Sequence, residues 1–550
     1  MSDALILPDL IANLHVAARQ AQNLVGLLKA AAAERVSRDG RLDRAGLDAE
    51  QHVAHGLAWA AAYGETLNQT AAWAQDLQAQ GRLGESEALP AQLLAFEYLS
   101  QLAGGIPMNQ GEIFRPGDLG VDASNLSAII ASFQPGGTQA VKSRIIELLA
   151  LAQGKPALEA SGLDDTLDQI AGQFTAFAAA KITPFAHGWH LRDELIPLEL
   201  LQDLADLGVF GLTMPEAYGG SGLGKTAMCV VSEALSRGWI GTGSLGTRSE
   251  IAAELILAHG TPDQKDRFLT KIASGEIIPT AVFTEPTSGS DLGSLKTRAT
   301  LDGDTWRVTG AKTWITHAAR ADVMTLLVRT DPNSKDHRGL SMFLAEKPRG
   351  TMANPFPAKG MRGSEIAVIG YRGMKEYELA FDGFEVSNAN LLGGQTGQGF
   401  AQLMATFESA RIQTAARAIG VGQAALDVAL SYALERRQFG QPIAQFPRVA
   451  NKLAMMAAEL LGARRLAWFA ARAKDEGRRC DLEAGMAKLV AARIAWACAD
   501  NAVQIHGGTG FAVEQSVSRL LADARILNIF EGAGEIQAQV IARRLLGDAN

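Results

Sequence analysis

The sequence has little cysteine and no long uninterrupted run of apolar residues. Only three cysteines occur in 550 residues (Cys229, Cys480 and Cys498), and no two of them are spaced as CxxC. This scarcity excludes a disulfide framework and favours a reducing compartment. No apolar run approaches the length of about 18 residues that crosses a bilayer, and the first residues lack the basic and apolar segments of a secretion signal. We therefore expect a soluble cytoplasmic protein.

An excess of positive charge is also missing. The chain carries 51 Lys and Arg residues against 59 Asp and Glu residues, a net charge of −8, which argues against nucleic-acid binding as the main task. His52/His55 and His187/His190 share a three-residue spacing, but no carboxylate or cysteine cluster completes a zinc site around them. No GxSxG string is present and no GxGxxG opens a helix after a strand, so neither a hydrolase nor a Rossmann nicotinamide site is supported.

Apolar residues spaced three or four apart indicate helices over most of the chain. Residues 10–28 form such a stripe near the start, and residues 153–166 are typical of a linker. The other segments with the helical pattern are 45–77, 128–152, 170–182, 197–207, 249–259, 262–272, 420–436, 449–476 and 483–505. The length is too great for a single core, so we expect several domains.

The segment from about residue 280 has a different pattern. It contains TWRVTGAKTWIT, VMTLLVRT, LSMFLAEK and YELAFDGFEV, which are rich in Val, Thr and aromatic residues and separated by turn residues. These segments predict a β-domain between helical regions. The predicted division is a helical extension (1–160), a helical domain (161–279), a β-domain (280–396) and a C-terminal helical bundle (397–550), in the α+β class but mainly α.

One weak internal repeat is present. QLAGGIPMNQGE (residues 101–112) resembles QIHGGTGFAVEQ (residues 504–515). The pair is explained either by chance or by an N-terminal extension that imitates the C-terminal bundle.

Two strings near the β-domain are candidates for ligand binding. AVFTEPTSGSDLGS (residues 281–294) offers small hydroxyl groups and backbone N–H groups suited to a flavin or a phosphate, although its composition also fits a plain surface loop. KTWITHA (residues 312–318) places an aromatic, a branched and a hydroxyl side chain on one strand. Such a strand either walls a planar ring or belongs to the sheet core.

Three further strings lie in the C-terminal part. ERRQFGQP (435–442) brings two guanidinium groups to a helix end, where they either grip phosphate oxygens or interact with the helix dipole. QIHGGTGF (504–511) has paired glycines that permit close backbone approach or cap a helix. LNIFEGAGEIQ (527–537) places Glu531 directly before Gly-Ala-Gly, so a bulky ligand can approach the backbone beside a carboxylate.

Together and in this order, these strings resemble the acyl-CoA dehydrogenase family from about Asp165 to the C-terminus. The resemblance implies a helical domain, a β-barrel-like domain and a four-helix bundle, with FAD held between the β-domain and the bundle. It implies four groups of cofactor-binding residues. The first forms a loop that contacts the flavin and the pyrophosphate, and the second forms a wall beside the flavin. The third reaches the FAD of a neighbouring subunit, and the fourth contacts the adenosine. These are Phe283, Thr284, Gly289, Ser290, Trp314, Thr316, Arg436, Gln438, Phe439, Gln504, Gly507 and Gly508.

The resemblance also implies that Glu531 is the catalytic base. It would remove the α-proton of an acyl-CoA thioester while the β-hydride leaves to flavin N5. The enolate-like charge then needs two hydrogen-bond donors, which in the family are the backbone N–H of the base and a ribityl hydroxyl of FAD. Ala410 precedes Arg411 where some members of the family carry an alternative base, so Glu531 is the sole candidate. The family implies an electron-transferring flavoprotein as acceptor and a cofactor site shared between subunits, hence at least a dimer.

Residues 1–160 exceed the family core. Members with such an extension oxidise (2S)-methylsuccinyl-CoA to mesaconyl-CoA, so the resemblance implies a short branched dicarboxylic substrate. Arg248 falls where relatives line the acyl pocket and could pair with the free carboxylate, or instead bond to Glu250 or a backbone carbonyl. Arg362 and Arg372 are alternative partners.

Ser290, Arg411 and Gly532 are further expected substrate contacts. Glu376 either approaches the flavin or caps a turn. Two alternatives to the dehydrogenase remain. An acyl-CoA oxidase is disfavoured because such enzymes carry a further C-terminal extension, and a non-catalytic flavin-binding protein is disfavoured by Glu531. We expect the extension to cover the face through which related dimers form tetramers, which predicts a homodimer.

Overall fold

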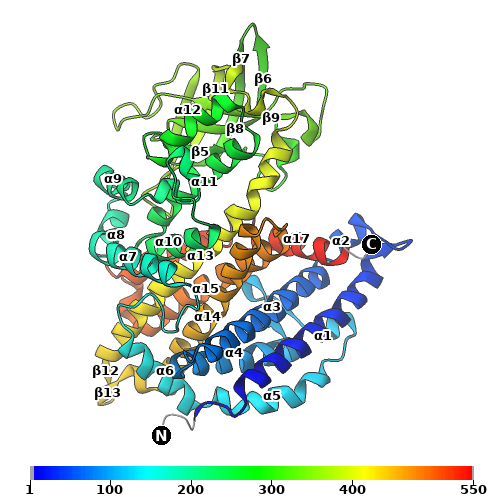
Figure 1. The fold of residues 1–550 in the computed structure, drawn as a ribbon, viewed down its shortest axis with the longest axis vertical. Coiled ribbons are helices and arrows are strands. Elements are labelled where there is room, and N and C mark those ends of the chain that lie inside the picture. Colours follow the sequence, from blue (N-terminus) through cyan, green and yellow to red (C-terminus); the bar gives the residue numbers. More distant parts are fainter. Residues whose placement is uncertain (1–4, 548–550) are drawn as a thin grey trace. The chain divides into compact units, whose positions relative to one another are not determined.

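The computed structural model describes residues 5–547 and divides the chain into two compact units (Figure 1). The first unit comprises Met1–Ala180, Glu233–Gly238 and Thr414–Asn550, and the second comprises Lys181–Ser232 and Trp239–Gln413. Helices α10 (Lys225–Gly238) and α13 (Gly399–Glu435) contribute residues to both units. The division into four domains stays a prediction from the sequence.

The N-terminal part of the first unit is built on three long helices. Helices α1 (Leu10–Val36), α3 (Gln51–Ala79) and α4 (Glu85–Gly104) contact one another and lie side by side (Figure 1). The stripe of apolar residues in α1 is buried, as its spacing of three and four predicts. In α3 nearly the whole central portion is buried, so this helix is enclosed on several sides.

These helices pack against the C-terminal part of the same unit. Helix α14 (Pro447–Asp475) contacts α3 and α4, while α15 (Asp481–His506) and α17 (Gly534–Gly547) contact α3. Small residues permit the close approach, because a Cβ added at Gly462 would lie 2.7 Å from Leu94 Cδ2. The extension therefore shares one core with the helices that carry the C-terminal motifs.

Other helices of the first unit are shorter than α1, α3, α4, α14 and α15. They are α2 (Arg44–Ala49), α5 (Ser127–Phe133), α6 (Gln139–Leu151), α7 (Asp165–Lys181) and α16 (Ser516–Ile526). Three two-stranded ribbons accompany them: β1 (Ser37–Arg38) with β2 (Arg41–Leu42), β3 (Ile106–Pro107) with β4 (Ile113–Phe114), and β12 (Arg437–Gln438) with β13 (Gln441–Pro442).

The second unit combines a sheet with helices. Its sheet runs in the order β10-β11-β7-β6-β8-β5, and β9 pairs with β8. The strands are β5 (Pro279–Val282), β6 (Arg298–Asp302), β7 (Thr305–Thr316), β8 (Val323–Arg329), β9 (Leu340–Glu346), β10 (Met361–Ile366) and β11 (Glu376–Ser387). The helices before the sheet are α8 (Thr183–Leu191), α9 (Leu198–Asp206), α11 (Ile240–His259) and α12 (Pro262–Ala273).

Several local predictions differ from the structure, and the helix expected over 249–259 already begins at Ile240. The helix expected over 128–152 is interrupted, because Pro135-Gly136-Gly137 forms a 3-10 turn between α5 and α6. The helix expected from residue 420 begins already at Gly399. Strand β10 was not predicted, because most of its side chains are exposed and it lacks the apolar alternation of a half-buried strand.

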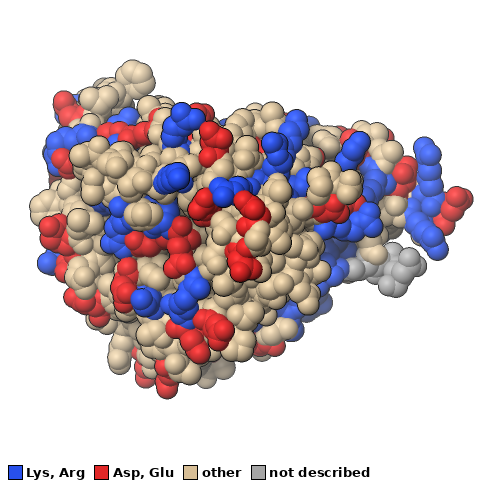
Figure 2. All heavy atoms as spheres, turned by 90° about the horizontal axis from the view of Figure 1, so that it is seen from above, with Lys and Arg blue, Asp and Glu red and all other residues tan. Residues whose placement is uncertain are grey.

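The surface carries both signs of charge. Lys/Arg and Asp/Glu side chains are interspersed over the face shown in Figure 2, as expected of a chain without a large basic excess. Within residues 5–547, no helix combines the length and the apolar character required to cross a bilayer. The three cysteines are buried, and none of them forms a disulfide.

Candidate active site

The backbone of the EGAG segment has an unusual conformation. Between α16 and α17, Glu531 has φ of +53° and Gly532 has φ of +90°. A non-glycine residue in the left-handed region costs roughly 1–2 kcal/mol, and such residues persist where the surroundings enforce them, often at functional sites. The left-handed conformation of Glu531 therefore lowers the stability of the fold, and it sets the direction in which the Glu531 side chain points.

Three hydrogen bonds hold this turn. Lys488 Nζ, on α15, donates to the carbonyl oxygen of Gly532 at 2.6 Å. Gln537 Nε2 donates to the carbonyl oxygen of Glu531 at 3.2 Å, and the N–H of Gly534 donates to the carbonyl oxygen of Asn528 at 3.0 Å. The side chains of Lys488 and Gln537 are fully buried, which limits the access of water to the bonds that they donate.

A buried arginine stands beside the Glu531 carboxylate. Arg417 Nη2 lies 3.9 Å from Glu531 Oε1, and the Glu531 side chain is only 15% exposed. The Arg417 guanidinium also lies 4.9 Å from the centre of the Phe530 ring and donates to Thr414 Oγ1 at 2.7 Å. The sequence alone did not single out Arg417, Lys488 or Gln537. A lone charged or amide residue in an alanine-rich helix is usually solvated, and only the tertiary packing reveals these contacts.

In the second unit, a buried ion pair organises the loop that follows β5. Lys312 Nζ lies 3.0 Å from Glu285 Oε1 and donates to the carbonyl oxygen of Phe283 at 2.8 Å. Burial lowers the pKa of Lys312 to about 8. Burial raises the pKa of Glu285, but the charge of Lys312 and the N–H groups of Lys296 and Thr297 outweigh that effect and lower it overall.

The loop residues predicted to bind cofactor differ in exposure. Phe283 and Thr284 are half-buried, while Gly289 and Ser290 are exposed. The carbonyl oxygen of Thr284 accepts a bond from the N–H of Thr313 at 3.0 Å, which ties the loop to β7.

A β-bulge in β7 exposes Trp314. Ile315 pairs with Tyr377 and Lys312 pairs with Leu379, so two residues of β7 face one residue of β11. Trp314 has φ of +58°, and it is 57% exposed, although it lies in a strand with a buried face. An exposed indole displayed by a bulge is a suitable wall for a planar ligand.

Arg248 and Glu376 meet at Thr316. Thr316 Oγ1 donates to Glu376 Oε1 at 2.8 Å, and Arg248 Nη2 lies 3.5 Å from the same hydroxyl oxygen. All three side chains are buried. The structure thus brings together a predicted substrate contact, a predicted flavin-wall residue and the carboxylate of unassigned role.

The other candidate arginines have different surroundings. Arg362 is exposed on β10. Arg372 is half-buried, and it donates to the carbonyl oxygens of Val368 at 3.0 Å and His190 at 2.9 Å. Arg411 is half-buried with its guanidinium 5.8 Å from the centre of the Phe407 ring.

The remaining predicted cofactor residues are exposed in the first unit. Arg436, Gln438 and Phe439 lie between α13 and β13, with Gln438 in strand β12, and Phe439 is 95% exposed. Gln504, Gly507 and Gly508 lie at the end of α15, and a Cβ at either glycine would meet no atom within 4 Å. Both sets leave side chains and backbone accessible to a ligand or to a second subunit.

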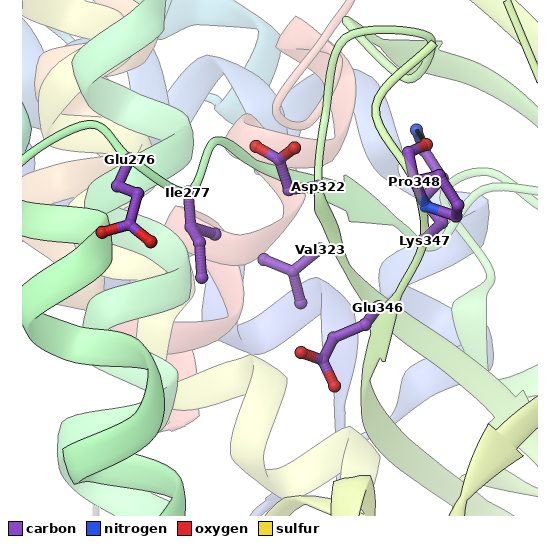
Figure 3. Close-up of a pocket in the computed structure, with 7 residues that line it drawn as sticks. All are labelled: Glu276, Ile277, Asp322, Val323, Glu346, Lys347 and Pro348. Atoms are coloured by element: carbon purple, nitrogen blue, oxygen red, sulfur yellow. Dashed lines mark hydrogen bonds between the residues drawn. The ribbon is translucent and has the colours of Figure 1, made fainter.

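A surface recess in the second unit is not this site. It is lined by Glu276, Asp322, Glu346 and Lys347 together with apolar neighbours, and it contains none of the predicted site residues (Figure 3). In the part of the chain that the structure describes, no group of three or more His, Cys, Asp or Glu side chains is arranged to hold a metal ion.

Comparison with known proteins identifies the family. Residues 164–276, 280–384 and 397–546 match the N-terminal, middle and C-terminal domains of acyl-CoA dehydrogenases. The chain is 60% identical to the (2S)-methylsuccinyl-CoA dehydrogenase of Cereibacter sphaeroides over 98% of this chain and 99% of that protein. That alignment includes the N-terminal extension, which the three family domains do not reach.

Solved structures agree. Butyryl-CoA dehydrogenase from Megasphaera elsdenii is 30% identical with a TM-score of 0.66, over 70% of this chain and 99% of that one. A glutaryl-CoA dehydrogenase in complex with glutaryl-CoA is 34% identical with a TM-score of 0.66, over 70% and 96%. The chain therefore belongs to the acyl-CoA dehydrogenase family, and the family and fold class predicted from the sequence are confirmed. It is an oxidoreductase.

Proposed function

We propose that this protein oxidises (2S)-methylsuccinyl-CoA to mesaconyl-CoA with FAD as its cofactor. The observation that carries the proposal is the 60% identity, through the N-terminal extension as well as the family domains, to an enzyme that acts on this thioester. Residues 281–294, 312–318, 435–442 and 504–511 supply the motifs expected of an FAD site.

The exposed side chains and glycines fit a large cofactor. The Trp314 indole offers a flat surface for a flavin ring, and the backbone around Gly289 and Ser290 offers N–H groups to a pyrophosphate. Arg436, Gln438 and Phe439 would reach a cofactor bound to the neighbouring subunit, and the open backbone at Gly507 and Gly508 suits adenosine. When bound, FAD accepts the hydride that leaves the β-carbon of the substrate.

Glu531 removes the proton from the α-carbon of the thioester. The constrained backbone aims its carboxylate, and Arg417 stands beside that carboxylate. Because Gly532, Ala533 and Gly534 have little or no side chain, we expect the thioester to lie close to this backbone, on the side that Gln537 and Asn109 do not occupy. The N–H of Glu531 then donates to the thioester carbonyl oxygen and stabilises the charge that develops there.

Arg248 is the proposed partner of the second substrate carboxylate. It is buried, and its Nη2 lies 3.5 Å from Thr316 Oγ1. A guanidinium can donate two parallel, charge-assisted bonds to a carboxylate. Arg372 already donates to two backbone carbonyl oxygens and Arg362 is exposed, so both are weaker candidates.

The proposal includes a dimer in the cytoplasm that passes electrons to an electron-transferring flavoprotein. The extension covers α14 and α17 of its own chain, which supports its predicted role in preventing a tetramer. A native mass of two chains is expected, and a mass of four would contradict this part.

The substrate is tested by following flavin absorbance anaerobically. Purified holoenzyme is mixed with (2S)-methylsuccinyl-, butyryl-, isobutyryl- and glutaryl-CoA. Rapid bleaching with methylsuccinyl-CoA alone supports the proposal. Bleaching only with monocarboxylic thioesters contradicts the substrate, and no bleaching with any thioester contradicts the enzymatic function. Rapid reoxidation by O2 with release of peroxide would indicate an oxidase instead.

A further inference from the structure

A short hairpin of the N-terminal extension is anchored on α3. Strands β3 and β4 pair Ile106 with Phe114, and both side chains are fully buried. A Cβ added at Gly56 of α3 would lie 2.1 Å from Phe114 Cδ2, so the phenyl ring sits directly on the backbone of that helix. The hairpin is therefore held rigidly at its base.

The tip of this hairpin presents Asn109. The N–H of Met108 donates to the carbonyl oxygen of Glu112 at 2.8 Å, and the N–H of Glu112 donates to that of Asn109 at 3.2 Å. Gln110 and Gly111 close the turn with φ of +51° and +84°. Asn109 itself is buried, with 8% exposure.

Asn109 packs against Gly534, the residue that follows Glu531-Gly532-Ala533. A Cβ added at Gly534 would lie 2.1 Å from Asn109 Nδ2, so the amide fills the space beside that glycine. Gly534 is the first residue of α17, and its N–H makes one of the bonds that hold the Glu531 turn. The contact thus joins the extension to the backbone three residues after Glu531.

The extension also forms hydrogen bonds with α17 about one and a half turns further along that helix. Gln539 Oε1 lies 2.9 Å from His55 Nε2 of α3, and Gln539 Nε2 donates to Asp48 Oδ1 of α2 at 3.0 Å. Helix α17 is therefore fixed by the extension at its start and along its length.

We propose that the N-terminal extension is a positioning element of the active site. Asn109 at the hairpin tip holds Gly534 and so keeps Glu531 in its left-handed conformation. Asn109 is a positioning residue that acts through Gly534 and touches no reacting atom. The inference rests on the proposed role of Glu531, but its test includes a measurement that does not depend on catalysis.

The test is a reciprocal pair of substitutions in the full-length holoenzyme. Asn109→Ala leaves Gly534 unsupported, and Gly534→Ala drives a methyl group into the Asn109 amide. In the double variant Asn109→Ala/Gly534→Ala the new methyl occupies the space that the amide leaves. Asn125→Ala is the matched control, because Asn125 is an exposed asparagine of the same extension.

Two quantities are measured on each protein. The first is amide hydrogen exchange of the peptide covering residues 527–537, and the second is the anaerobic rate of flavin reduction by (2S)-methylsuccinyl-CoA. Each single variant is expected to speed exchange in this peptide and to lower the maximal rate of flavin reduction about tenfold, with little change in the substrate concentration that gives half of this rate, because the base is misplaced while binding remains. The double variant is expected to recover most of both losses, and Asn125→Ala to match the wild type.

Wild-type exchange and rates in Asn109→Ala would overturn the inference, as would a double variant no better than Gly534→Ala. Should Asn109→Ala fail to fold, Asn109→Ser takes its place with the same expectation. If catalysis proves independent of Glu531, the proposed function fails, while the exchange data still decide whether Asn109 holds the turn.

Discussion

The ammonium group of Lys488 donates to the carbonyl oxygen of Gly532 at 2.6 Å, immediately after the proposed base Glu531. Lys488 has no exposed surface. A buried lysine is expensive to desolvate, so this one is expected to have a role that alanine or leucine cannot fill. It fixes the peptide that sets the direction of the Glu531 side chain.

Replacing Lys488 by methionine is expected to lower kcat about tenfold and the free energy of unfolding by about 1–3 kcal/mol, since the carbonyl oxygen of the half-buried Gly532 loses its donor. Steady-state kinetics and chemical denaturation measure the two effects. Lys155→Met is the control, because Lys155 is exposed in the same unit. Unchanged kcat in Lys488→Met would show that the bond does not position the base.

Gly532 is expected to tolerate no side chain. Its φ is +90°, and a Cβ there would lie 2.0 Å from Gln537 Nε2. Gly81 also has a positive φ (+68°), but a Cβ there meets no atom within 4 Å. Gly81→Ala should therefore report backbone strain alone, roughly 1–2 kcal/mol of unfolding free energy, with a normal reaction rate.

Gly532→Ala combines that strain with the clash. We expect a larger loss of stability and a flavin reduction rate lowered about 100-fold, since a displacement near 1 Å suffices for that effect. Equal consequences of the two substitutions would mean that the packing of Gln537 on Gly532 does not matter.

Arg248 is expected to control substrate choice. Arg248→Met should lower kcat/KM for (2S)-methylsuccinyl-CoA about 100-fold, because the substrate carboxylate loses its charged partner, and should affect butyryl-CoA far less. Arg298→Met, at an exposed arginine of the same unit, serves as the control. An equal loss for both thioesters would assign Arg248 to the packing around Thr316 and Glu376 instead.

Acid is expected to destabilise the second unit through His317. Burial, followed by the charge of Arg320, lowers the pKa of His317 to about 3. The unfolded chain keeps the ordinary value of 6.5 and therefore binds the proton first as the pH falls. Stability contributed by neutral His317 is complete above pH 6.5 and is lost toward pH 3, by up to about 1.4 kcal/mol per pH unit.

His317→Gln should make the free energy of unfolding less dependent on pH between 7 and 5, a range above most carboxylate titrations. The dependence in His337→Gln, at an exposed histidine, should match the wild type. Parallel curves for wild type and His317→Gln would contradict the depressed pKa.

The sequence predicted the strands with strong alternation, and its motifs predicted the family. TWRVTGAKTWIT coincides with β7, because its apolar side chains alternate along the strand. In the sheet, β7 lies between β11 and β6. Glu531 stood out because the three residues that follow it, Gly-Ala-Gly, have almost no side chains. The substrate contacts and the cofactor contacts stay predictions that rest on resemblance.

The supports of the turn could not be predicted in the same way. Lys488, Gln537 and Arg417 lie 43, 6 and 114 residues from Glu531 and have no local signature. The bulge that exposes Trp314 depends on pairing with β11, which lies far along the chain. Such features arise from tertiary packing, which sequence periodicity does not encode.

The most direct test of the account is single-turnover flavin reduction by (2S)-methylsuccinyl-CoA in Glu531→Gln. Glutamine keeps the shape of the side chain but cannot accept the α-proton, and Glu535→Gln, at an exposed glutamate four residues on, is the matched control. The account predicts a rate at least about 10³-fold below that of the wild type for Glu531→Gln and a normal rate for Glu535→Gln. Reduction by Glu531→Gln within tenfold of the wild type, with FAD bound, would show that another group removes the proton.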